Sequence, residues 1–251
     1  MNALNTPVGK KAKAIENSLV KEFKRIYRNS IEPYLGFLTI EEIKRGLETE
    51  INNLIRSKVE QAYKLGSVAV ANFIKEPNIF TSNDDHMNIG LLASALADEF
   101  WATIEHLGVR ATQHEVVDER IEPLTPFNVF AALLGISSWI AFSSVNDGIR
   151  SKTLQLKDSI TNLSEAEAVR RFGNLAHFTI KDRLVSTSER GFPIKFVYLT
   201  ANDGKVDPQF CGPLNRKEFE IDDKSAPQPP LHRHCRCVIV PKNLLTNEFL
   251  I

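Results

Sequence analysis

The stretch from Pro123 to Asn146 contains no charged side chain, and this limits how the chain can fold. Within it, residues 127–145 (FNVFAALLGISSWIAFSSV) have the length and composition of a helix that needs apolar surroundings. We expect a helix buried on most sides, against the rest of the chain or against neighbouring copies. Asn128 and the serines keep its hydropathy modest, and a membrane contact by residues 127–145 is the alternative. The small residues that would permit close helix contact are Gly135, Ser137, Ser138 and Ser144.

Helical periodicity extends through most of the first 160 residues. Residues 10–28 place apolar side chains three to four positions apart. A second helix is expected from Thr39, which has capping-box spacing with Glu42, to about Lys75, and Gly66 is expected to kink or divide it. A third helix should follow the polar run 81–85. The predicted buried face of this third helix consists of Leu91, Leu92, Leu96, Phe100, Trp101, Ile104 and Leu107.

The first predicted helix has a basic face. The whole chain is neutral, with 31 basic and 31 acidic residues, so bulk charge does not predict a nucleic-acid coat or an anionic membrane partner. The basic residues outnumber Glu16 and Glu22, the acids of this segment, and two interpretations follow: a solvated face on a packed helix, or an arm that contacts phosphates or an acidic partner. The candidate contact residues are Lys10, Lys11, Lys13, Lys21, Lys24, Arg25 and Arg28.

The periodicity changes after about residue 190. Residues 164–188 are expected to form a helix, and residues 193–200 (PIKFVYLT) have the β-branched and aromatic content of a strand. Short strands are also expected at residues 219–221 and 238–240. The predicted fold is therefore mainly α, with long helices over residues 1–160, followed by a small α+β module with a short antiparallel sheet over residues 161–251.

All three cysteines of the chain lie in this last module. Cys235 and Cys237 are separated by one residue, so in an extended segment both thiols point to the same side. With Cys211 and His232 they form the pattern Cys-x20-His-x2-Cys-x-Cys, a ligand set suited to a closed, structural zinc site. His234 is an alternative to His232. A disulfide from Cys211 to one of the paired cysteines and three reduced thiols are the other two interpretations.

The run from Pro229 to Cys237 (PPLHRHCRC) resembles the PP-x-H-x-x-CRC signature of bacteriophage Mu F-like minor head proteins, also called phage head morphogenesis proteins. The order upstream is also similar: a strand, Asp207, Cys211, then Leu214 and Asn215. The resemblance covers about residues 160–241. It departs from the family at Pro208, which stands where the family has the first cysteine of a Cys-x-x-Cys pair.

This resemblance implies a minor capsid protein with a binding role and not an enzyme. It would be present in a few copies inside the head, near the portal vertex, and act in head assembly and in DNA packaging or delivery. Its implied partners are the portal protein, a capsid or scaffolding protein, and packaged DNA. The alternatives are a DNA-binding zinc module and a metal-dependent nuclease or toxin-like enzyme that uses Asp203, Asp207, Asp222 and Asp223. Without an apolar segment after the basic N-terminus, synthesis is expected in the cytoplasm of the host.

Overall fold

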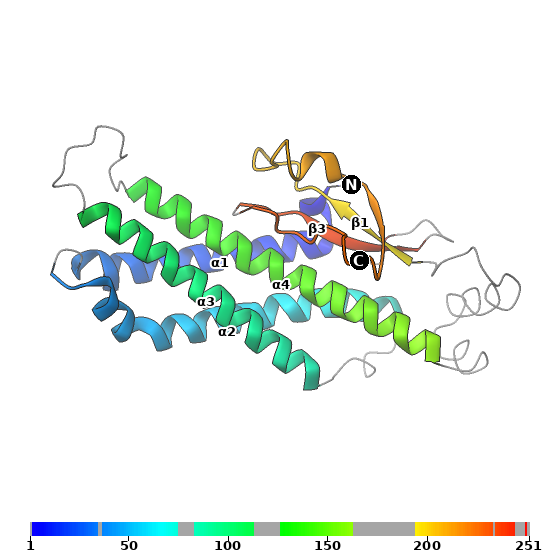
Figure 1. Ribbon diagram of the computed structural model, residues 1–251, viewed down its shortest axis with the longest axis horizontal. Helices are drawn as coiled ribbons and strands as arrows, with labels where there is room; N and C mark the ends of the chain where they lie inside the picture. The colour runs from blue at the N-terminus through cyan, green and yellow to red at the C-terminus, as the bar shows by residue number, and fades with distance from the viewer. Residues whose placement is uncertain are drawn as a thin grey trace, which may run out of the picture.

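Four long helices form the larger part of the computed structural model (Figure 1). The structure describes residues 2–34, 37–74, 83–112, 126–162, 194–232, 234–243 and 249. The helices are α1 (Pro7–Ile26), α2 (Ile40–Ile74), α3 (Asn83–Thr112) and α4 (Pro126–Asn162). The helix predicted over residues 164–188 lies outside the described residues.

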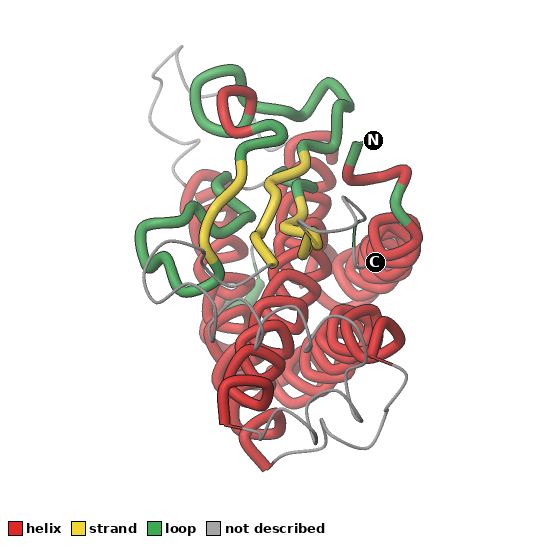
Figure 2. Tube along the Cα trace, turned by 90° about the vertical axis from the view of Figure 1, so that its right-hand side faces the viewer, coloured by secondary structure: helices red, strands yellow, loops and turns green. Residues whose placement is uncertain are grey.

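A three-stranded antiparallel sheet lies against one side of the helices, over α4 and the N-terminal part of α1 (Figures 1 and 2). Its central strand is β1 (Ile194–Leu199), with β2 (Glu218–Glu220) on one edge and β3 (Val238–Asn243) on the other. Side chains of the sheet and of the helices belong to one apolar core cluster. The fold class predicted from the sequence is confirmed, although the sheet is not packed separately from the helices.

Helix α4 occupies the centre of the molecule and contacts α1, α2, α3 and β3. It is long and apolar enough to cross a membrane, but 72% of its most apolar window is buried inside the molecule. Three of its hydroxyl groups are satisfied without water, because Ser137, Ser144 and Thr153 each donate a hydrogen bond to the carbonyl four residues earlier in α4. The charge-free part of α4 is thus buried by the rest of the chain.

Helices α2 and α4 approach each other backbone to backbone at Gly66 and Gly148. A Cβ atom on Gly66 would lie 2.2 Å from the carbonyl oxygen of Val145, and one on Gly148 would lie 2.2 Å from the carbonyl oxygen of Tyr63. Since α2 continues unbroken through Gly66, the expectation that this residue divides the helix was wrong. Gly66 is needed for the close contact between the two helices.

The starts of α1 and α2 follow from local sequence. Thr6 accepts a hydrogen bond from the Gly9 amide at the start of α1. Thr39 and Glu42 form the predicted capping box, in which the Thr39 amide donates to the Glu42 carboxylate at 2.8 Å. The prediction for the face of α3 was wrong at Leu91, which is 67% exposed, although Leu96, Phe100, Trp101 and Ile104 are buried.

Candidate metal centre

Two separate loops bring the three cysteines together. Cys211 lies just before a short 3-10 helix, and its amide donates to the carbonyl of Asp207 at 3.0 Å. The Asp207 carboxylate in turn accepts hydrogen bonds from the next turn of backbone. Cys235 and Cys237 precede β3, and the Cys235 amide donates to the carbonyl of His232 at 2.9 Å. Both loops are therefore fixed by their own backbone hydrogen bonds.

The sulfur atoms have the spacing of metal ligands. All three lie within 4.8 Å of one another, and the Cys211 and Cys235 sulfurs are 3.6 Å apart. Four ligands at the zinc–sulfur distance of about 2.3 Å place neighbouring sulfurs about 3.8 Å apart in a tetrahedron. Cys211, Cys235 and Cys237 are each at most 1% exposed. The three buried cysteines can hold a metal ion, and none of them is in a disulfide.

The cluster has one acidic thiol. Hydrogen bonds from the side chain and backbone of Cys237 and from the backbone of Leu231 lower the pKa of Cys235 to about 5. The pKa of Cys211 is raised, chiefly by burial, and the pKa of Cys237 is raised because its thiol bonds the Cys235 sulfur. Tyr198 also contacts the Cys211 sulfur through its hydroxyl, at 3.5 Å. Three buried sulfurs that lie this close together are ligands that a soft cation such as zinc would bind as thiolates.

The fourth predicted ligand is not in contact with the others. Among the residues that the structure describes, the compact ligand group contains only the three cysteines, so three of the four predicted residues are brought together. The Nε2 atom of His232 is nevertheless buried and has no hydrogen-bond partner in the described part of the chain. Its position on the turn that leads into Cys235 keeps it near the cluster in the chain. The ring of His234 packs instead against Gly135 of α4, where a Cβ atom would lie 3.0 Å from its Cε1.

The arginine between the paired cysteines is held by a buried ion pair. Arg236 donates from Nε and Nη2 to the carboxylate of Glu16 on α1, with a shortest distance of 2.6 Å, and from Nη1 to Asp203 at 2.8 Å. Glu16 is fully buried and also accepts from Lys13 and Ser138. Sequence reasoning missed this pair. The signal that could have revealed it is the helical spacing of Glu16, which places this acid on the same face as the buried apolar residues of α1.

Asn146 was also missed, because its partners are backbone atoms. Its side-chain amide donates to the carbonyls of Pro229 and Cys237, both at 3.1 Å. Its oxygen accepts from the amide of Ile239 at 3.0 Å. A single polar residue at the end of the charge-free stretch thus binds both sides of the cysteine segment.

The four aspartates considered for a nuclease-like site are used elsewhere. Asp203 pairs with Arg236, and Asp222 pairs with Lys157 at 2.6 Å. Asp207 and Asp223 accept hydrogen bonds within their own turns. No carboxylate joins the three cysteines in the ligand group found among the described residues.

The basic residues of the first helix lie on a packed element, not on a free arm. Helix α1 buries an apolar face in the bundle. Four of the seven candidate cations have partners: three on α1, and Arg28 on the π-helical turn that follows it. Lys13 pairs with Glu16, Arg25 pairs with Glu22 and Glu50, and Lys24 and Arg28 lie over the ring of Phe130. The three that are exposed and form no ion pair within the described part of the chain are Lys10, Lys11 and Lys21.

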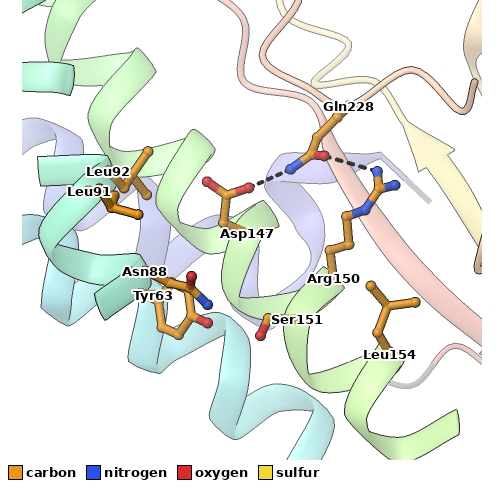
Figure 3. Close-up of a pocket in the computed structure, with 9 residues that line it drawn as sticks. All are labelled: Tyr63, Asn88, Leu91, Leu92, Asp147, Arg150, Ser151, Leu154 and Gln228. Atoms are coloured by element: carbon orange, nitrogen blue, oxygen red, sulfur yellow. Dashed lines mark hydrogen bonds between the residues drawn. The ribbon is translucent and has the colours of Figure 1, made fainter. Parts of the chain in front are cut away.

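A second feature is a pocket of about 480 Å³ between α2, α3, α4 and the loop before Pro229 (Figure 3). On its wall, the Gln228 amide bridges two residues of α4: it donates to Asp147 and accepts from Arg150 at 2.9 Å. Exposed Leu91 lines the pocket together with Leu92. Burial raises the pKa of Asp147 to about 6.

This raised pKa predicts a pH-dependent stability. The folded chain binds the Asp147 proton more tightly than the unfolded chain does, so the stabilisation is present below the unfolded pKa and is lost as pH rises to about 6. We expect Asp147→Asn to be more stable than the natural chain at pH 7, by at most about 3 kcal/mol, with no gain at pH 4. Urea denaturation at both pH values measures this. Asp222→Asn is the control without a gain, because Lys157 lowers the pKa of that exposed carboxyl. A gain for Asp147→Asn that is equal at both pH values would contradict the prediction.

The molecule is a helical bundle around the long helix α4, with a small antiparallel sheet and a buried cluster of three cysteines. Hydrogen bonds of Arg236 and Asn146 hold the cysteine segment against the helices. No protein-family model, curated protein or solved structure matches the chain.

Proposed function

We propose that this chain is a minor head protein of a tailed bacteriophage, located inside the head near the portal. The observation that supports this most is the way the PPLHRHCRC segment is used: its cysteines enter a buried cluster and its arginine binds Glu16. All of these contacts lie inside the molecule. They hold the segment rigidly, as a docking unit requires. We propose a role in head assembly and in DNA packaging or delivery, through binding and not catalysis.

The test is the presence of the chain in particles. Heads purified from the producing host are expected to contain it in a few copies per portal, by quantitative mass spectrometry. Crosslinking should join it to the portal protein. If purified heads lack the chain while infected cells contain it, the proposal is wrong.

We infer that this site binds a zinc ion, held by Cys211, Cys235, Cys237 and His232. Thiolate and imidazole ligands favour zinc, and a site with four protein ligands and no open position is structural. The buried, unpartnered Nε2 of His232 supports its role, since a buried nitrogen without a hydrogen bond is costly unless it binds something.

Metal analysis tests this centre. We expect one zinc per chain in the natural protein and none in the double variant Cys235→Ser with Cys237→Ser. His232→Ala should lower zinc affinity, whereas the matched variant His234→Ala should not. Equal zinc content in all four proteins would contradict the assignment.

We propose that the exposed face of α1 contacts DNA phosphates, because Lys10, Lys11 and Lys21 are exposed and form no ion pair with any described residue. The adjoining half of α4 carries no charge that would cancel theirs. Changing the three lysines to glutamine should weaken DNA binding and lower the slope of log affinity against log salt by about 0.9 for each lost contact. The control changes Lys44, Arg45 and Arg56 of α2 to glutamine. An equal loss in both triple variants would point to net charge and not to this face.

A further inference from the structure

The metal centre and α1 are far apart in the chain but joined in space. Glu16 and Arg236 are 220 positions apart, yet their charged groups form a two-pronged contact that is closed to solvent. Lys13 and Ser138 complete the hydrogen bonds of the same carboxylate. A fork of this kind fixes the orientation of the guanidinium as well as its distance.

That orientation decides where the cysteines point. In an extended segment, successive side chains alternate between two sides. Since Arg236 points to Glu16 on one side, Cys235 and Cys237 must point to the other, towards Cys211. A shift of the segment by one residue would reverse all three. Asn146 holds the same segment from α4, through the Cys237 carbonyl and the Ile239 amide.

We propose that Glu16 is a positioning residue of the metal centre: through Arg236 it holds the Cys235–Cys237 segment in its metal-binding conformation. This inference rests on the proposed zinc site. The centre is then built by the helical bundle and is not a self-contained module. By thermodynamic linkage, zinc binding must in turn stabilise α1.

The experiment is zinc competition with a chromophoric chelator, on the full chain. Glu16→Gln keeps the shape of the side chain but removes its charge, and we expect it to bind zinc about 10–100-fold more weakly, the usual effect of losing an outer-shell partner. The matched control is Glu22→Gln, which removes an exposed acid of the same helix and should leave the affinity unchanged. Cobalt(II) loading adds a spectroscopic readout: the sulfur-to-cobalt absorption of Glu16→Gln should be weaker or shifted.

A second variant separates positioning from folding. Glu16→Met with Arg236→Met replaces the buried ion pair by apolar side chains, which commonly restores stability. We expect this double variant to fold and still to bind zinc at least about tenfold more weakly, because no fork aligns the segment. Hydrogen exchange of the natural chain should show slower exchange in α1 when zinc is added.

The outcomes are distinct. If the natural chain binds no zinc, the proposed zinc centre fails. If it binds zinc and Glu16→Gln or the double methionine variant binds with the same affinity, the zinc centre stands and the positioning role of Glu16 is overturned.

Discussion

Gly66→Ala is expected to destabilise the protein by about 3 kcal/mol or more, at or above the upper end of the usual cost of overpacking. The added Cβ would lie 2.2 Å from the Val145 carbonyl oxygen, and an atom of the backbone cannot move aside as a side chain can. Helices α2 and α4 would have to separate along their central contact. Helix α4 also packs against the sheet and carries Asn146. The loss of stability should therefore appear as one cooperative shift of the urea denaturation midpoint.

Gly46→Ala is the matched control in the same helix. No atom lies within 4 Å of the position that its Cβ would take, so only helix propensity acts there. We expect this variant to be more stable than the natural chain, by up to about 1 kcal/mol. If both glycine variants changed stability in the same direction, the close contact between α2 and α4 would not exist as described.

Asn146→Leu is expected to have a comparably large effect, about 3 kcal/mol or more. The substitution leaves the carbonyls of Pro229 and Cys237 and the amide of Ile239 buried without partners. Each buried group that loses its hydrogen bond costs about 1–3 kcal/mol, which the added apolar volume of leucine offsets only in part. The measurement is thermal and urea denaturation, with zinc affinity as a second readout because Cys237 is a proposed ligand.

Ser144→Ala provides the comparison for Asn146. Ser144 is also buried in α4, but its hydroxyl bonds only the Ile140 carbonyl of its own helix. That carbonyl keeps its helical partner when the hydroxyl is removed, so the change should be within about 1 kcal/mol. A loss as large as that of Asn146→Leu would mean that polarity in α4, and not the link to the cysteine segment, determines stability.

Local chemistry explains why much of the fold was predictable. Apolar spacing, the capping box at Thr39 and the strand composition before Thr200 act over a few neighbouring residues. Each of these yields an element close to its predicted bounds. Burial of the charge-free stretch was predictable because its residues have no favourable contact with water. The cysteine cluster was predictable because the period of an extended chain places Cys235 and Cys237 on one side.

Long-range pairing explains what was not predictable. Leu91 has the helical spacing of the buried face of α3, but it lies at a pocket because the neighbouring helices do not cover it there. Nothing in the sequence around Gly66 indicates that a second helix approaches it closely. His232 has the chemistry of a ligand, yet its place relative to the sulfurs depends on a turn. For Leu91 and Gly66 the deciding contact comes from a distant part of the chain.

The sequence by itself determined the long helices, the small sheet and three cysteines at one site, because periodicity and residue chemistry act locally. Only the tertiary structure decided that the helix containing the charge-free stretch is the centre of the molecule and that Glu16 and Asn146 hold the cysteine segment. The physical reason is that a buried charge or amide must find its partners wherever the packed helices place them. Those places are set by how the helices meet and not by spacing along the chain.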